Sequence, residues 1–244
     1  MPRFAIISDI HANWEALAEV LRDISSRKIS NVVCLGDIVG YGPDPKACID
    51  LVRENCLTVV MGNHEVFSTM PNSLDRFHRA VREPIELAKK ELDPDDINWI
   101  RRLPVTEMVD DFTIVHASLY HPVMFLHMHS DSDAKDHFKN QSSKVCFLGH
   151  THIPAIFERS DGDAIGLINI KQGVALEPAK KYAINAGSVG QPRDGDCRAC
   201  YVEFDTTEQE VQFHRVEYDW EKTKAKLKEK GFSRSLGDRL ERGC

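Results

Sequence analysis

Short apolar runs alternate with amphipathic helical patterns along the first 60 residues, and this alternation constrains the fold more than any other feature. The runs at 4–8, 31–36 and 57–61 are predicted to be buried strands. Between them, 14–27 and 44–55 place apolar side chains at helical spacing. Strands that alternate with helices in this way indicate a parallel sheet covered by helices.

The pattern changes further along the chain. Residues 66–103 are predicted to be mostly helical, and 112–116 and 144–149 return to strands. The histidine-rich stretch between these two strands, 121–138, is predicted to be an irregular surface loop. After residue 153, short β-rich runs follow one another without intervening helices, which indicates an antiparallel sheet.

The last part of the chain is charged and helical. We predict one domain over 1–217 and a helical tail over 218–244 that packs on it, with helix breaks at Gly231 and Gly237. A length of 244 residues suits one large α/β domain with such an appendage. A homodimer formed through the tail is a further hypothesis, which the mass in solution would test.

Composition excludes several classes of protein. The net charge of −7 argues against a general nucleic-acid-binding surface. The apolar runs are too short for a signal sequence or a membrane span, so we expect a cytoplasmic protein without a membrane partner. Seven irregularly spaced cysteines fit reduced thiols better than a disulfide framework. Cys197 and Cys200 form a C-x-x-C, but no second pair at a matching spacing completes a zinc site, so we expect ordinary thiols.

Metal-capable side chains follow five of the predicted strands. They are Asp9 and His11, Asp37, Asn63, His116, and His150 with His152. In open α/β sheets, sites form outside the carboxyl ends of the strands. Parallel strands would therefore gather these five ends in one crevice. In D-x-H and H-x-H the second residue can return to the same side, so each pair can deliver two ligands to one small volume.

The chemistry of these seven side chains favours two metal ions. Carboxylate, amide oxygen and imidazole suit Mn, Fe, Zn, Ni or Co, and we expect two divalent ions, with Mn first. Seven ligands exceed what one open catalytic zinc takes from its protein, but they suffice for two ions if a carboxylate bridges. Asp37 is the natural bridge, since it stands alone at its strand end. Any one of these residues alone would be a helix cap or an ordinary histidine; their joint occurrence favours a metal site.

The order D-x-H, G-D, G-N-H-E, H, G-H-T-H resembles the calcineurin-like metallophosphoesterase superfamily. The later AINAGSVGQPRDGD, residues 183–196, is similar to a stretch of the small bacterial phosphodiesterase-like members. The resemblance implies a four-layer αββα sandwich of two mixed β-sheets flanked by helices. It also implies two ligand sets, for the first ion Asp9, His11, Asp37 and His152, and for the second Asp37, Asn63, His116 and His150. His64 would contact the phosphate with Asn63 and protonate the leaving oxygen.

One block departs from part of the family. Protein serine/threonine phosphatases and dinucleoside tetraphosphate hydrolases carry G-D-x-V-D-R-G, but here Gly40 and Tyr41 replace the Asp-Arg pair. The acid that would orient His64 and the arginine that would grip phosphate are therefore absent. Arg193 is the candidate that restores the positive charge at a substrate-binding position; the alternative is an arginine that stabilises a turn.

The expected function is that of a dinuclear-metal-dependent phosphoesterase. It would hydrolyse phosphodiester bonds of small substrates such as nucleotides, with phosphomonoesters left open, through a hydroxide that bridges the ions and attacks phosphorus directly. Asp37 and His64 are the expected catalytic residues. The alternatives are a protein serine/threonine phosphatase or dinucleoside polyphosphate hydrolase, and a non-catalytic metal-binding interaction scaffold. The loop histidines, His121, His127 and His129, either line the substrate entrance or are solvated.

Overall fold

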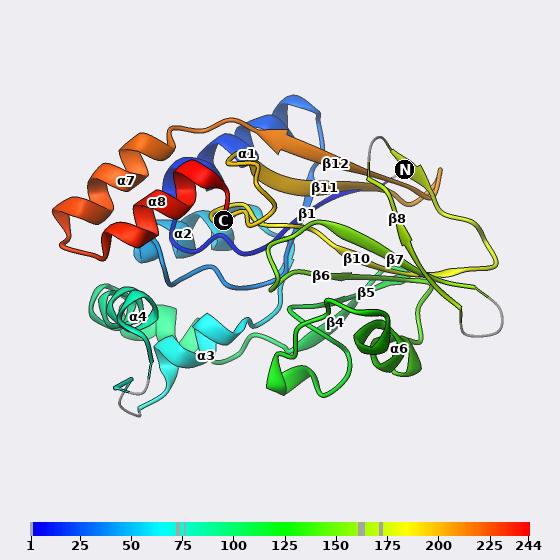
Figure 1. Cartoon of the computed structure of the whole chain (residues 1–244), viewed down its shortest axis with the longest axis horizontal. Coiled ribbons are helices and arrows are strands. Elements are labelled where there is room, and N and C mark those ends of the chain that lie inside the picture. Colours follow the sequence, from blue (N-terminus) through cyan, green and yellow to red (C-terminus); the bar gives the residue numbers. More distant parts are fainter. Residues whose placement is uncertain (1, 72–73, 76, 161–163, 171–172) are drawn as a thin grey trace.

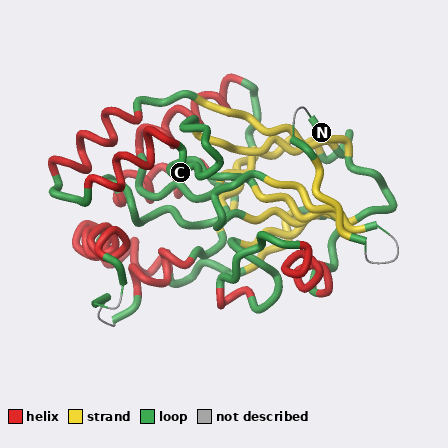
Figure 2. Tube along the Cα trace, viewed as in Figure 1, coloured by secondary structure: helices red, strands yellow, loops and turns green. Residues whose placement is uncertain are grey.

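Two mixed β-sheets pack face to face, with helices on their outer faces and gathered at one end of the molecule (Figures 1 and 2). The computed structural model describes residues 2–71, 74, 75, 77–160, 164–170 and 173–244. The strands are β1 (Arg3–Ile7), β2 (Asn31–Cys34), β3 (Thr58–Val59), β4 (Thr106–Val109), β5 (Phe112–Val115), β6 (Val145–Leu148), β7 (Ala155–Arg159), β8 (Ile165–Ile168), β9 (Val174–Ala175), β10 (Lys181–Asn185), β11 (Ala199–Asp205) and β12 (Glu210–Val216). The helices are α1 (Trp14–Ser26), α2 (Pro45–Asn55), α3 (Asn63–Thr69), α4 (Arg79–Glu91), α5 (Pro94–Ile100), the 3₁₀ turn η1 (Pro122–Met124), α6 (Asp131–Lys139), α7 (Trp220–Glu229) and α8 (Arg234–Arg242).

Each sheet combines parallel and antiparallel strands. The first has the order β3-β2-β1-β11-β12-β9, in which β1, β2 and β3 are parallel and β11 is antiparallel to β1. The second has the order β4-β5-β6-β10-β7-β8, in which β5, β6 and β10 are parallel. The expectation of a parallel half followed by an antiparallel half was therefore wrong, because late strands return to pair with early ones in both sheets. The mixed sheets implied by the family resemblance are confirmed.

The side chains of the central strands alternate between two hydrophobic layers. On β1, Phe4 and Ile6 point into the interior between the sheets, whereas Ala5 and Ile7 face the helices that cover the first sheet. Strand side chains alternate with a period of two, so a strand buried on both faces is apolar throughout. The residues of α1 and α2 belong to the layer outside the first sheet, and those of α6 to the layer outside the second. These layers make the four-layer sandwich.

Three local elements differ from the sequence-based expectation. Helix α6 begins within the stretch predicted to be irregular, with a capping box in which Ser130 and Asp133 bond each other's backbone N–H. Strand β4 was not predicted and forms a hairpin with β5. Gly231 does end α7, with φ +75°, but Gly237 lies inside α8. A Cβ at residue 237 would meet the side chain of Lys224 of α7 at 2.6 Å. The glycine permits close contact between the two helices and breaks neither.

The tail packs on the rest of the chain. Helix α7 contacts α1 and α8, and the hydroxyl of Thr223 donates a 2.9 Å hydrogen bond to Oδ1 of Asn13. Lys226 lies 2.8 Å from the carboxylate of Asp44. A boundary at residue 217 stays a prediction. No described helix has the length and apolar character that crossing a bilayer requires.

Phe112→Ala is expected to destabilise the protein by about 3–5 kcal/mol, the usual cost of deleting a buried phenylalanine. Its ring lies edge-on to those of Phe4, Phe147 and Phe204, with centroids 5.1, 5.3 and 5.6 Å away, between the two sheets. The midpoint of urea unfolding would measure the loss. Leu167→Ala, at a side chain 67% exposed, is the control and should change stability by less than about 0.5 kcal/mol. Similar midpoints for both variants would contradict this account of the core.

Candidate metal centre

The candidate ligands come from both sheets. Asp9 and Asp37 follow β1 and β2, and Asn63 begins α3 just after β3, so these loops leave the first sheet. His116 follows β5 and His150 follows β6, so they leave the second sheet. The prediction that the ends converge is confirmed, but not the single parallel sheet that was expected to bring them together. They meet because the two sheets are stacked with these ends on the same side (Figure 1).

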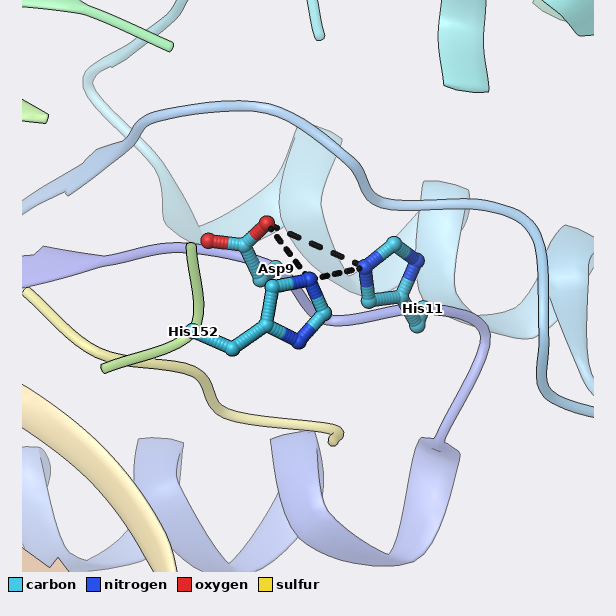
Figure 3. Close-up of side chains that lie close together, drawn as sticks. All are labelled: Asp9, His11 and His152. Carbon is cyan, nitrogen blue, oxygen red and sulfur yellow. Dashed lines mark hydrogen bonds and ion pairs between the residues drawn. The ribbon is translucent and has the colours of Figure 1, made fainter. Parts of the chain in front are cut away.

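The first group consists of Asp9, His11 and His152 (Figure 3). Oδ1 of Asp9 lies 3.3 Å from Nε2 of His152 and 3.8 Å from Nε2 of His11, and the two Nε2 atoms are 3.1 Å apart. The other ring nitrogens face carbonyl oxygens, Nδ1 of His11 that of Val39 at 3.2 Å and Nδ1 of His152 that of Gln191 at 2.6 Å. Because a carbonyl only accepts, each Nδ1 carries the proton and each Nε2 presents a lone pair to the shared space.

The second group consists of Asp37, His116 and His150, with Asn63 beside them. Nε2 of His116 lies 3.3 Å from Oδ2 of Asp37, 3.2 Å from Nδ1 of His150 and 3.2 Å from Oδ1 of Asn63. Nδ1 of His116 lies 2.8 Å from the carbonyl oxygen of Leu35. Since that carbonyl only accepts, Nδ1 carries a proton, and Nε2 faces the other three side chains.

Asp37 lies between the two groups. Its Oδ2 is 3.3 Å from Nε2 of His116 and 3.7 Å from Nε2 of His11, and its Oδ1 accepts the backbone N–H of His64 at 2.9 Å. This is the position that a bridging carboxylate requires. Buried atoms without a hydrogen-bond partner, Oδ1 of Asp9 and Nε2 of His150, occur in the same cluster. Divalent cations fit this set of oxygen and nitrogen donors.

Several of these residues have left-handed backbone conformations. Positive φ angles occur at Asp9 (52°), His11 (48°), Asp37 (52°), His150 (68°) and His152 (62°). Such angles are uncommon outside glycine and persist only where the surroundings enforce them, which is typical of functional sites. Here the N–H of His11 donates to the carbonyl of Asp37 at 2.9 Å, and the N–H of His150 donates to the carboxylate of Asp9 at 2.9 Å. The two sheets thus hold each other's ligand loops.

Burial and a neighbouring charge have opposite results at the two carboxylates. Burial raises the pKa of Asp9 to about 6. Burial acts in the same direction on Asp37, but the charge of the neighbouring His116 outweighs it and holds the pKa of that carboxyl well below its usual range. Conversely, burial acts to lower the pKa of His116, and the Asp37 carboxylate overcomes it and raises that pKa to about 9.

Burial also keeps the remaining imidazoles neutral. It lowers the pKa values of the other three candidate ligand histidines: His11, His150, whose pKa falls to about 3, and His152. Neutral imidazole is the form that binds metal. The metal-free protein therefore already holds these rings in the required protonation state.

Glu65 is a structural member of the site that sequence reasoning left without a role. Its side chain is fully buried and accepts the backbone N–H groups of Asp37 at 2.7 Å, Ile38 at 2.8 Å, Val39 at 3.2 Å and Gly62 at 3.0 Å. Burial raises the pKa of Glu65 to about 7. The side chain ties the loop after β2 to the start of α3. In the sequence, Glu65 is the fourth residue of the G-N-H-E motif, and that position could have indicated a role in the site.

The stretch 183–196 supports the ligand loops from the other side. Oγ of Ser188 donates to the carbonyl of Asp9 at 2.8 Å, and Nδ2 of Asn185 donates to the carbonyl of Gly149 at 2.6 Å. These contacts explain why family members would share this stretch, since they fix the backbone just after Asp9 and just before His150.

His64 and Arg193 lie beside the cluster. The ring of His64 is buried and 4.8 Å from that of His11, and its Nδ1 has no hydrogen-bond partner. This agrees with the sequence, in which Gly40 replaces the acid that would orient the His64 imidazole. The guanidinium of Arg193 lies 5.7 Å from the ring of Tyr41 and donates to Oε1 of Gln191 at 3.1 Å. Its charge acts on His11 and His64, although burial is the larger reason that their pKa values are low.

The loop histidines divide into two kinds. The ring of His127 lies 4.2 Å from that of His150, and His129 stacks on His127 at 5.2 Å. His121 instead lies against Tyr120, with ring centroids 4.3 Å apart. All seven cysteines are free thiols, and the candidate metal clusters of the described residues contain neither Cys197 nor Cys200.

Comparisons with known proteins agree with this arrangement. Residues 3–209 match the sequence model of the calcineurin-like phosphoesterase superfamily domain. An uncharacterized protein of Methanocaldococcus jannaschii is 38% identical over 242 residues, which cover 97% of this chain and 96% of that protein. The crystal structure of a metallophosphoesterase from Sphaerobacter thermophilus superimposes with a TM-score of 0.88 at 37% identity, over 100% of this chain and 99% of the other.

Part of the chain is also similar to an enzyme of named activity. The symmetrical bis(5′-nucleosyl)-tetraphosphatase of Erwinia tasmaniensis is 26% identical over 115 residues, which cover 46% of this chain and 42% of that enzyme. The family domain spans the whole set of converging side chains, and the long matches extend through the tail. This chain belongs to the calcineurin-like phosphoesterase superfamily, whose members hydrolyse phosphoric esters.

Proposed function

We propose that the chain is a dinuclear-metal-dependent phosphodiesterase that acts on small phosphate esters such as nucleotides and cyclic nucleotides. The observation that carries the proposal is the position of Asp37 between two groups of ligand-type side chains. One group would hold the first ion through Asp9, His11, Asp37 and His152, and the other the second ion through Asp37, Asn63, His116 and His150. Manganese is the first candidate for both positions.

Bound divalent ions would supply two things, a water of lowered pKa as nucleophile and positive charge for the phosphate oxygens. The protein's contribution is to hold the donors in place, through left-handed backbone and the N–H groups fixed by Glu65. Two serines beside the candidate ligand Asp9 are already engaged, since Oγ of Ser8 donates to the Asp9 carboxylate at 2.7 Å and Oγ of Ser188 to the Asp9 carbonyl at 2.8 Å. This supports attack by solvent without a covalent enzyme intermediate.

His64 is the proposed general acid. Burial lowers its pKa, so the ring is neutral before substrate binds. A phosphate anion placed beside the ring favours the imidazolium, because an opposite charge stabilises the charged form. Protonation of His64 would then accompany substrate binding, and the proton would pass to the leaving oxygen. Asn63 and Arg193, on either side of the cluster, are the proposed contacts for the phosphate oxygens.

Two alternatives remain beside this proposal. The tetraphosphatase match favours a dinucleoside polyphosphate hydrolase, but it covers less than half of either chain, and Gly40-Tyr41 removes the Asp-Arg pair of those enzymes and of the protein serine/threonine phosphatases. A non-catalytic scaffold would not need His64 buried beside the ligand cluster.

Hydrolysis assays with Mn separate these activities. We expect release of p-nitrophenol from bis-p-nitrophenyl phosphate and turnover of cyclic nucleotides, with slower reaction of p-nitrophenyl phosphate, diadenosine tetraphosphate and a phosphoserine peptide. Preference for the tetraphosphate or the peptide would establish one of the phosphatase alternatives. A protein that binds Mn but hydrolyses none of these compounds would support the scaffold.

Asp37→Asn should remove both ions, since one carboxylate serves the two positions. The loss of Mn affinity should exceed the roughly 10–100-fold that residues behind a ligand usually cost. Calorimetric titration and elemental analysis after gel filtration would measure it, with about two ions per chain expected in the wild type. Asp111→Asn, the same change at an exposed turn, is the matched control. Two tightly held ions in Asp37→Asn would place the bridge at another residue.

His64→Ala should retain both ions and lose roughly 10²–10⁴-fold in kcat on a cyclic nucleotide, the usual contribution of a general acid. His121→Ala, which removes an exposed loop histidine, should leave kcat unchanged. Initial rates and metal content of both variants would be measured together. Normal turnover by His64→Ala would exclude the residue from the mechanism.

A further inference from the structure

The candidate general acid is held by ring packing where related enzymes have a carboxylate. Nδ1 of His64 is buried without a hydrogen-bond partner, and a Cβ built at Gly40 would lie 2.1 Å from it. With the His64 ring in this position, no side chain fits at residue 40. The orientation of the imidazole must therefore come from other contacts.

Tyr41 makes the closest of these contacts. Its ring centroid lies 4.7 Å from that of His64 and 4.7 Å from that of His11. Phe67 lies on His64 at 5.8 Å, and the guanidinium of Arg193 is 5.7 Å from the Tyr41 ring. Tyr41 thus touches the proposed acid, one candidate metal ligand and the proposed phosphate contact together.

The tail helices support Tyr41 from the other side. Its side chain packs against the apolar cluster that Leu227 of α7 and Leu236 and Leu240 of α8 form with Ala80. The space enclosed by these leucines, Tyr41 and His11 is about 10 Å³, room for at most one water molecule. On the side of the tail, the ring therefore has almost no free volume into which it could turn.

The tail also contacts three loops, those that contain Tyr41, His11 and Arg193. Lys226 lies 2.8 Å from the Asp44 carboxylate, three residues after Tyr41. Thr223 donates to Asn13, two residues after His11, at 2.9 Å. Near the end of the chain, the carbonyl of Gly243 accepts the N–H of Gly195 at 2.8 Å, two residues after Arg193. Helices α7 and α8 lie outside residues 3–209, the part of the chain that matches the family domain.

We propose that the C-terminal helices α7 and α8, acting through Tyr41, hold the His64 imidazole in the orientation that protonates the leaving oxygen. Tyr41 is then a positioning residue, and the tail is a functional part of the active site. This inference rests on the proposed function, since it assigns His64 the role of general acid.

The dependence of rate on the leaving group tests it. A general acid matters most for a poor leaving group, so the substrates are diphenyl phosphate and bis-p-nitrophenyl phosphate, or the corresponding monoesters if these react faster. Tyr41→Ala should lose roughly 10–100-fold in kcat on the phenyl ester, the scale of a misplaced catalytic group, and much less on the p-nitrophenyl ester. KM and the number of bound Mn ions should not change. Tyr41→Phe, which keeps the ring, should behave as the wild type.

Leu240→Ala tests whether the tail helices position His64, and it replaces Tyr41→Ala if that variant does not fold. It should show the same selective loss on the phenyl ester, to a smaller extent. Leu57→Ala is the matched control, since this leucine is 64% exposed, and both rates should stay normal. In the metal-free protein, Leu240→Ala should also shift the ¹H–¹⁵N NMR signals of the His64 imidazole.

A double-mutant cycle decides whether Tyr41 acts through His64. In the His64→Ala background, Tyr41→Ala should cause no further loss, because residues that act as a unit are not additive. Equal losses on both esters, a full loss in the His64→Ala background, or an unshifted His64 signal in Leu240→Ala would each overturn the inference. A wild-type protein that hydrolyses no phosphate ester would instead refute the proposed function.

Discussion

The burial of two carboxylates in one small volume is the constraint on which the rest of the site depends. Asp9 and Asp37 are almost fully inaccessible to solvent, and an ionised carboxylate without compensation costs several kcal/mol when buried. In the metal-free protein the compensation is partial. The pKa of Asp9 rises to about 6 because of burial, while the positive charge of His116 stabilises the Asp37 carboxylate. Divalent cations would compensate the charge of both carboxylates. The free-energy cost of burying Asp9 and Asp37 without such compensation therefore favours metal binding.

The buried carboxylates stay in place because the loops of the two sheets hold each other. A Cβ at Gly149, before His150, would lie 1.9 Å from Oγ of Ser8, and one at Gly190 would lie 1.7 Å from the carbonyl oxygen of Ile10. Loops from the two sheets therefore touch at backbone distance beside the first ligand group. Contacts this close can hold the left-handed conformation of Asp9 and its neighbours, which a looser loop would release.

The residues of the site could be predicted from the sequence, but not the route by which they meet. Metal-capable side chains directly after apolar runs identify the candidates, because a strand end is a fixed local position. The sheet to which each run belongs depends on pairings such as Phe4 with Phe204 and Tyr182 with Val145, and a strand buried on both faces has no pattern that names its partner.

Two further features escaped prediction for local reasons. Glu65 sits in the first turn of α3, where an acidic residue usually stabilises the helix N-terminus, so its bonds to the loop after β2 had no separate signal. Helix α6 did carry a signal, the capping pair Ser130 and Asp133, but the histidines around it favoured a loop.

The replacement of a carboxylate by ring packing has a chemical consequence for His64. A hydrogen-bonded carboxylate would fix the tautomer and raise the pKa of the imidazole, so the ring would carry its proton before substrate arrives. Packing against Tyr41 fixes the position of the ring but adds no charge, and burial then keeps its pKa low. The proton would be acquired only when a phosphate anion is bound. In this chain the charge of the substrate would determine whether His64 is protonated. The packing of Tyr41 against α7 and α8 would determine the orientation of the ring.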